Sequence, residues 1–118
     1  LGLPETTAAE KKVKAEAMEQ GLKNAIEVPL SVMTRASNAW TPLKEVARFG
    51  NIASASDVQV GAKALETGIW GALKNVEINM VDITDADYKE KTLNRARTIA
   101  EQSSADCREV LDILAGRS

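Results

Sequence analysis

Histidine is absent from the 118-residue chain, and cysteine occurs once, as Cys107. Without histidine the chain cannot build a His-containing zinc site, a Ser-His-Asp triad or a Cys-His nucleophile pair. A lone cysteine forms no internal disulfide and fits a reducing compartment, which favours a cytoplasmic protein. Any proton transfer by this chain therefore falls to Asp, Glu, Lys or Tyr side chains.

Aromatic residues and clustered positive charge are also scarce. Aromatic residues make up 3% of the chain, the net charge is −2, and the longest basic run is Lys11-Lys12. A surface for nucleic-acid phosphates or stacked bases is therefore not expected. No apolar stretch approaches the roughly 18 residues needed to span a membrane, and the N-terminus has no signal-peptide pattern. We expect neither nucleic acid nor a membrane as a partner.

The residues that are present predict helices almost throughout, because apolar residues recur at three- and four-residue steps and no strand-like alternation occurs. Thr7 and Glu10 have the spacing of a capping box. Pro29 and Pro42 are expected to kink or interrupt the helices in which they lie. With so few aromatics, the core must be built from Ala, Val, Leu and Ile, which suits closely packed helices.

Turn signals divide the rest of the chain. Gly50-Asn51 is expected to end a helix, with the asparagine as a left-handed cap. The next helix is expected to start near Ser54 or Ser56, and the last to follow Thr84 or Asp85 as its N-cap. The fold class predicted is all-α: an antiparallel helical bundle of about four helices with proline kinks, part of a larger helical domain.

The helix expected after Ser54 has an unusual composition. Glycines in its interior cost about 1 kcal/mol each relative to alanine, so another contact must compensate. One face combines small residues with two side-chain amides, a shallow groove that could accept a planar heterocycle. The more common role of such a face is close helix–helix contact, with the asparagines bridging helices. The residues on this face are Gly68, Gly71, Ala72, Asn75, Asn79 and Asp82.

Other chemistry-bearing residues have simple structural interpretations. Asp57 lies in the first turn of that helix, where the dipole favours a carboxylate; a functional Asp57 would hold a cationic group or move a proton. Cys107 lies in the apolar seam of the last helix and is expected to be a small buried hydrophobe. Trp40 and Trp70 are expected to be core or interface anchors, and Lys63 to be solvated.

Several short motifs, in their order and spacing, resemble the cyclodeaminase/cyclohydrolase family of folate-processing domains. The resemblance covers nearly the whole chain and rests on the combination, because no single motif is specific. The motifs are the leading LGLPETTAAEKK, VPL (Val28–Leu30), GN (Gly50-Asn51), SD (Ser56-Asp57), KALETG (Lys63–Gly68), NVEIN (Asn75–Asn79) and DITD (Asp82–Asp85).

The resemblance implies an all-α, usually dimeric protein that acts on one-carbon tetrahydrofolates without a metal or redox cofactor. Cyclodeaminases convert 5-formiminotetrahydrofolate to 5,10-methenyltetrahydrofolate and ammonia, and related cyclohydrolases hydrolyse the methenyl compound. It implies that Asn75, Asn79, Asp57, Gly68 and Gly71 face the substrate, with Asp57 as the catalytic candidate within this chain. A positioned carboxylate could protonate the departing amine.

The chain also departs from the family pattern. The LP segment lies in the middle of the family's domain, after a glycine-rich helical hairpin and an acidic stretch that holds the proposed catalytic Asp; neither occurs in this sequence. Residues 1–118 therefore resemble the C-terminal portion of such a domain. We expect the chain to need the missing N-terminal half, or a second copy as in a homodimer, because its apolar faces would otherwise be exposed.

Three hypotheses for function follow. The chain is a portion of a formiminotetrahydrofolate cyclodeaminase, a portion of a methenyltetrahydrofolate cyclohydrolase on the same scaffold, or a non-catalytic helical assembly module. The residues alone do not separate the first two. Ammonia release and methenyl hydrolysis are the assays that distinguish them.

Overall fold

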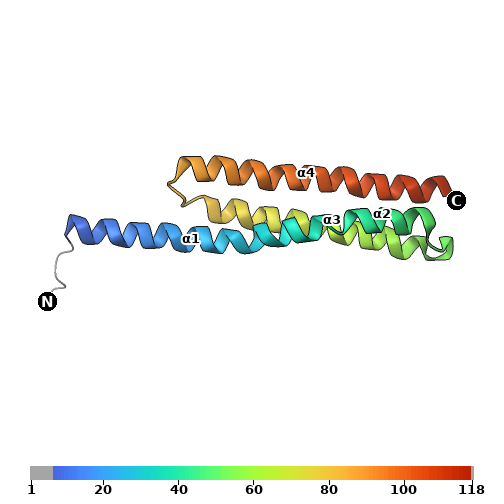
Figure 1. The fold of residues 1–118 in the computed structure, drawn as a ribbon, viewed down its shortest axis with the longest axis horizontal. Helices are drawn as coiled ribbons and strands as arrows, with labels where there is room; N and C mark the ends of the chain where they lie inside the picture. The colour runs from blue at the N-terminus through green and yellow to red at the C-terminus, as the bar shows by residue number, and fades with distance from the viewer. Residues whose placement is uncertain (1–6, 118) are drawn as a thin grey trace.

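The computed structural model describes residues 7–117, and their secondary structure is helical apart from short turns. Along the chain lie α1 (Ala8–Ser37), α2 (Trp40–Phe49), the 3₁₀ turn η1 (Ile52–Ser54), α3 (Ala55–Met80) and α4 (Ala86–Arg117). Figure 1 shows that α1 and α2 run in one direction, α3 returns beside them, and α4 runs back along α3. The predicted all-α, antiparallel arrangement is confirmed.

The molecule is long and thin, with extents of 74 × 27 × 16 Å. Its shortest dimension is not much larger than the diameter of a single helix with its side chains, about 10–12 Å. The first turns of α1 project beyond the other helices in Figure 1, and residues 7–18 are all exposed. A bundle this thin leaves the outer faces of its helices without a neighbour among residues 7–117.

The capping signals were largely correct. Thr7 Oγ1 accepts a hydrogen bond from the Glu10 backbone N–H at 3.0 Å, which caps α1. Asp85 Oδ1 accepts from the Tyr88 backbone N–H at 3.1 Å, so Asp85 caps α4. Ser54 stands at the start of α3 as expected, but its side chain makes no capping bond.

The two prolines have different consequences. Pro29 is buried within α1, and the helix continues through it from Ala8 to Ser37, so no new helix starts there. The chain is interrupted instead at Asn38 and Ala39, just before α2. Pro42 lies in the first turn of α2, where its missing N–H has no helical partner to lose. The interruption predicted near Pro42 is confirmed, three to four residues upstream of it.

The prediction for Asn51 was wrong. Its φ of −66° is not left-handed, and its side chain accepts from the Ala53 N–H at 3.0 Å to start η1. Gly50, the C-cap of α2, is also extended, with φ −72° and ψ 172°. A side chain at Gly50 would bring Cβ to 2.5 Å from the Val46 carbonyl oxygen. This turn therefore requires glycine for space and not for a positive φ.

The hydrophobic core runs between the helices and is built mainly of aliphatic residues. Trp40 is its one tryptophan, and Trp40 Nε1 donates to buried Ser103 Oγ at 3.2 Å. This confirms Trp40 as a core anchor on the side of α4. The buried hydrophobic residues of the core are Ile26, Leu30, Met33, Trp40, Ala47, Ala62, Ile69, Leu73, Val76, Met80, Ile83, Ala96, Cys107, Val110 and Leu114.

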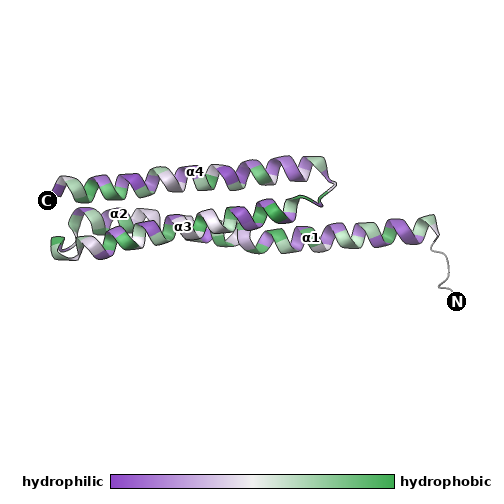
Figure 2. Ribbon diagram, turned by 180° about the vertical axis from the view of Figure 1, so that it is seen from behind, coloured by the Kyte–Doolittle hydropathy of each residue, from purple (hydrophilic) through white to green (hydrophobic). Residues whose placement is uncertain are grey.

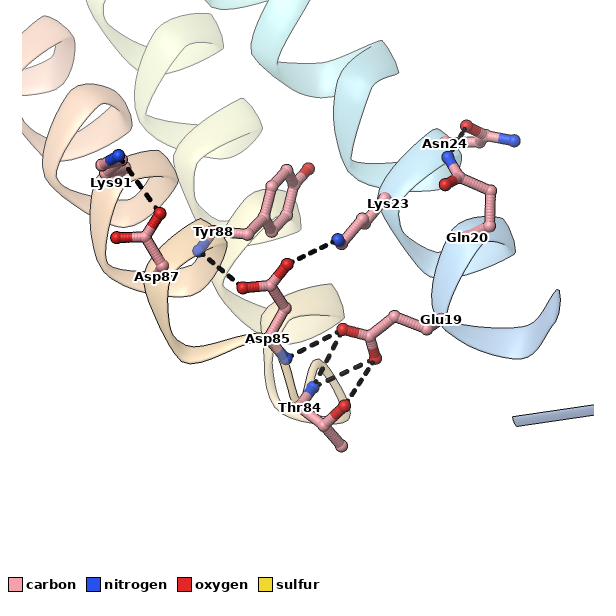
Figure 3. A network of polar contacts seen from close by, with 9 residues as sticks. All are labelled: Glu19, Gln20, Lys23, Asn24, Thr84, Asp85, Asp87, Tyr88 and Lys91. Atoms are coloured by element: carbon pink, nitrogen blue, oxygen red, sulfur yellow. Dashed lines mark hydrogen bonds and ion pairs between the residues drawn. The ribbon is translucent and has the colours of Figure 1, made fainter. Parts of the chain in front are cut away.

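A polar cluster ties α1 to the turn between α3 and α4 (Figure 3). Glu19 accepts hydrogen bonds from the backbone N–H groups of Thr84, at 3.1 Å, and Asp85, at 2.9 Å. Lys23 Nζ lies 2.8 Å from Asp85 Oδ2 and 4.8 Å from the centre of the Tyr88 ring. We call Glu19, Lys23, Thr84 and Asp85 the clasp. It fixes the register of α1 against the far end of α3.

The clasp shifts the proton equilibria of its members. Backbone N–H groups of Thr84 and Asp85 hold the pKa of Glu19 below its usual value. The hydrogen bond from Lys23 lowers the pKa of Asp85, and the same bond raises the pKa of Lys23. The fold therefore favours the charged form of each of the three groups over a wider pH range than an unfolded chain does.

Candidate functional site

Helix α3 carries a stripe of small and polar residues on the side opposite its core residues. Figure 2 shows hydrophobic and hydrophilic residues interspersed along α3. At 100° per residue the stripe residues lie within a narrow sector, because consecutive members are three or four residues apart. All are exposed except Asn79, which is half-buried. We call these residues the α3 stripe: Asp57, Gly61, Ala64, Gly68, Gly71, Asn75 and Asn79.

The Cβ positions of the glycines in the α3 stripe have no neighbour among residues 7–117. A Cβ atom added at Gly61, Gly68 or Gly71 would meet nothing within 4 Å. The alternative that these glycines allow close helix packing is therefore not realised among residues 7–117. The helix-propensity cost of the glycines remains uncompensated within the part of the chain that the structure describes.

The two amides of the α3 stripe lie together at its C-terminal end. Asn79 Nδ2 donates to the Asn75 carbonyl oxygen at 2.9 Å and to Asn75 Oδ1 at 3.2 Å. The asparagines thus bridge each other within one helix and do not bridge two helices. These bonds use neither Asn79 Oδ1 nor the amino group of Asn75, which leaves one acceptor and one donor group available to a ligand.

Asp57 lies at the other end of the α3 stripe. It is exposed in the first turn of α3, as predicted, and makes no side-chain hydrogen bond or ion pair with residues 7–117. Eighteen residues separate it from Asn75, which corresponds to about 27 Å along the helix. Asp57 and the amides therefore share a face but not a reacting centre within one protomer.

The other residues considered from the sequence, Cys107, Lys63 and Trp70, have different environments in the structure. Cys107 is buried, as expected, and burial together with the nearby Glu66 carboxylate raises its pKa, so it is not a reactive thiol. Lys63 is exposed and lies 3.3 Å from Glu66 Oε1. Trp70 does not belong to the core: 56% of its surface is exposed.

Trp70 lines a groove between α3 and α4 that sequence reasoning did not identify. The groove has a volume of about 410 Å³. We call it the Trp70 groove. Two antiparallel helices supply its walls, with the ring of Trp70 on one side and small or polar residues of α4 on the other. Its lining residues are Glu66, Thr67, Trp70, Leu73, Arg97, Ala100, Glu101 and Ser104.

Ion pairs fix one end of the Trp70 groove. Arg97 Nε donates a hydrogen bond to one Glu77 oxygen at 3.2 Å, and Arg97 Nη2 forms an ion pair with the same oxygen, also at 3.2 Å. Lys74 Nζ lies 3.1 Å from the other Glu77 oxygen and 5.3 Å from the centre of the Trp70 ring. The hydrogen bond from Lys74 lowers the pKa of Glu77, opposed by partial burial. Arg97 and Trp70 are thus held through a shared carboxylate.

The other end of the groove contains two carboxylates, of which one has hydrogen-bond partners and the other has none among residues 7–117. Partial burial raises the pKa of Glu66, but hydrogen bonds from Lys63, Ser104 and Cys107 outweigh it and leave the pKa below its usual value. Glu101 is exposed on α4 and has no ion pair or hydrogen bond of its side chain within residues 7–117. Glu101 is therefore the acceptor in the groove that remains available to a ligand.

Neither a metal centre nor a membrane span is found in the part of the chain that the structure describes. No group of three or more Cys, Asp or Glu side chains among residues 7–117 is arranged to hold a metal ion. No helix in that range is both long and apolar enough to cross a bilayer.

Comparison with known proteins identifies the family. Residues 1–98 match the family model for formiminotransferase-cyclodeaminase. This matched segment includes the whole α3 stripe. The chain belongs to this family. It is 46% identical over 101 residues to formimidoyltransferase-cyclodeaminase of Dictyostelium discoideum, and 42% identical over 117 residues to that of Gallus gallus. These alignments cover 86% and 99% of this chain.

The family members differ in length from this chain. The chain spans about a fifth of the curated formimidoyltransferase-cyclodeaminases it matches, 19% and 22% of the two proteins named above. It is also 28% identical over 104 residues to the methenyltetrahydrofolate cyclohydrolase of Methylorubrum extorquens, covering 88% of this chain and 50% of that protein. The resemblance to a folate-processing family is therefore confirmed.

Proposed function

We propose that this chain is the C-terminal portion of a formiminotetrahydrofolate cyclodeaminase domain, which forms 5,10-methenyltetrahydrofolate and ammonia. The observation that carries the proposal is the family match over residues 1–98, within which the α3 stripe lies. The exposed stripe supports it, because a face of small residues that ends in two amides suits a flat, hydrogen-bonding substrate. Tetrahydrofolate derivatives are the proposed substrates, and a cytoplasmic location is proposed with them.

The α3 stripe needs a second wall before it can enclose a substrate. We propose that the N-terminal half of the domain, or a second copy in a homodimer, supplies this wall. The 50% coverage of the Methylorubrum extorquens protein supports the first alternative, since that protein is twice as long as the matched segment. The exposed apolar residues Val60 and Ile78 on α3 and Val81 just after it, each at least 69% exposed, support an additional covering element.

The chemistry requires a proton for the departing amine. Asp57 is the carboxylate on the α3 stripe that we propose as candidate, although its distance from Asn75 means that it acts at the far end of the stripe or on a neighbouring protomer. A carboxylate from the rest of the domain is the other source of the proton. In both cases Asn75 and Asn79 orient the substrate, and Gly68 and Gly71 let its ring approach the helix.

The test uses the chain assembled with the upstream half of the domain. Asn75→Ala combined with Asn79→Ala is expected to weaken tetrahydrofolate binding about tenfold, because two hydrogen bonds are lost. Asn94→Ala is the matched control, an exposed asparagine on α4 without a side-chain partner within residues 7–117. Binding is measured by calorimetry and turnover by ammonia release. Unchanged binding by the double variant would contradict the amide assignment.

A cyclohydrolase activity is the second candidate, favoured by the similarity to the Methylorubrum extorquens protein. Hydrolysis of the methenyl compound without ammonia release from the formimino compound would establish it. An assembled domain that binds no tetrahydrofolate and catalyses neither reaction would leave the third hypothesis, a non-catalytic helical module.

A further inference from the structure

We propose that the Trp70 groove is a binding site for a flat amino-heterocycle, and that its ligand is the pterin ring of a reduced folate. The groove lies on the α4 side of α3, away from the α3 stripe to which the proposed function assigns the substrate, so it is a second folate-binding site built from this chain's own residues. The choice of a pterin rests on the proposed folate function. The groove itself rests on the geometry below.

The shape of the groove comes from residue size across two helices. Trp70 stands on α3, and Ala100 on α4 is the small residue that lines the opposite wall. Tryptophan is highly buried on average, yet 56% of the surface of Trp70 is exposed, and Trp70 lines the groove. The contact with Lys74 at 5.3 Å orients the ring. An ordered, exposed aromatic face is a stacking platform for a planar ring, worth about 1–3 kcal/mol for a nucleobase.

The polar groups of the groove match one edge of a pterin. That edge presents two N–H donors, from the 2-amino group and N3, beside the O4 acceptor. Glu101 supplies a carboxylate without another partner, which can accept both donors. Arg97, one helical turn away, donates from Nε to Glu77 and pairs with the same carboxylate through Nη2, which leaves Nη1 for the acceptor. Because Glu77 holds Arg97, the guanidinium does not neutralise Glu101.

The first experiment locates the ligand with the two tryptophans of the purified chain. Pterin is titrated into isotopically labelled protein, and the two indole N–H signals are followed by NMR. The Trp70 signal is expected to shift, while that of Trp40, buried and bonded to Ser103, stays in place. Para-aminobenzoylglutamate, the folate tail without the pterin, is expected to leave both signals unchanged. Equal shifts with both compounds, or no shift of Trp70 with pterin, would overturn the proposal.

The second experiment measures pterin affinity by calorimetry in variants whose helicity is first confirmed by circular dichroism. Trp70→Leu and Glu101→Gln are each expected to weaken binding about tenfold, from lost stacking and a lost charge-assisted hydrogen bond. Trp70→Phe is expected to restore most of the affinity. Glu90→Gln, an exposed α4 carboxylate outside the groove, is the matched control and is expected to bind as the unsubstituted chain does.

The results separate this inference from the proposed function. If Trp70→Leu binds pterin within about twofold of the unsubstituted chain, a change too small for a lost stacking contact, the groove proposal is wrong. Ammonia release by the assembled domain then still supports the cyclodeaminase. If the chain binds pterin in the groove but the assembled domain has no turnover, the groove proposal stands and the catalytic assignment fails.

Discussion

The two faces of α3 differ in residue size and burial, although they belong to one helix. The face toward α1 and α4 carries Ile69 and Val76, each fully buried, and each fills space between helices. The α3 stripe on the other side carries Gly68 and Gly71, where an added Cβ would meet no atom of the described residues within 4 Å. The buried face explains why α3 folds here. The stripe is explained only by something that lies against it.

This difference separates stability from function within a single element. Burial of aliphatic side chains stabilises the helix wherever it forms, at about 25 cal/mol per Å² of apolar surface. Interior glycines act in the opposite direction, at about 1 kcal/mol each. A helix that accepts that cost on one face has a requirement for close approach there, which is typical of a substrate or of a tightly packed helix.

The largest effect is expected from shortening a side chain on the buried face. Ile69→Ala should lower the free energy of unfolding by about 3 kcal/mol, because it removes buried methyl groups and leaves a cavity. Urea denaturation followed by circular dichroism measures the change. Ile78→Ala, 71% exposed on the same helix, is the matched control, with an expected change below about 0.5 kcal/mol. Similar losses for both variants would remove the distinction between the faces.

An intermediate effect of opposite sign is expected on the α3 stripe. Gly68→Ala and Gly71→Ala together should stabilise the isolated chain by about 1–2 kcal/mol, since the new methyl groups meet open space and helix propensity improves. In the assembled domain the same methyl groups should weaken association, because the covering element loses its close approach. Urea denaturation measures the first change and analytical ultracentrifugation the second.

Gly21→Ala is the control for the stripe. Gly21 also lies inside a helix with open space around its Cβ position, but on α1. Its substitution should stabilise the chain by about the same amount per residue and leave association unchanged. If all three glycines behave alike in the assembled domain, the stripe has no covering element and the proposal of a second wall is wrong.

The sequence predicted local features of the fold better than distant ones. The cap at Asp85, the core position of Trp40 and the interruption before Pro42 each depend on residues close along the chain, and each was correct. Asn51 was assigned incorrectly because the extended Gly50 before it ends α2, and the asparagine starts a new turn. In the sequence, a glycine needed because its backbone lies close to the Val46 carbonyl looks the same as a glycine needed for a positive φ.

Contacts between distant segments were not predictable from the sequence. Glu19 binds backbone groups 65 and 66 residues away, and no pattern around Glu19 indicates this. The Trp70 groove also depends on which residues of α4 face α3. Arg97, Glu101 and Ser104 do follow helical spacing, which could have marked one face of α4. Their meeting with Trp70 required the register between the helices.

The smallest effect is expected from acid, and it tests whether the two faces are independent. The clasp lowers the pKa values of Glu19 and Asp85, so its stabilisation is present above their unfolded pKa values, about 4, and is lost as pH falls through the folded ones. Lys23 has a raised pKa, so its contribution is present below about pH 10 and is lost as pH rises further. Unfolding stability should therefore be flat at neutral pH and decline below about pH 4.

Glu19→Gln should flatten that acid decline, measured by urea denaturation across the acidic range, whereas Glu16→Gln, one turn away and without a side-chain partner within residues 7–117, should not. The clasp holds α1 against the end of α3, so its share of the decline reports the contact between α1 and α3, and Glu66 and Glu77, whose pKa values are also lowered, contribute the rest. A protein with Gly68→Ala should then show the same pH slope at a higher overall stability. A changed slope would mean that the stripe is coupled to the clasp through α3, and the two faces would no longer be separate determinants of stability and function.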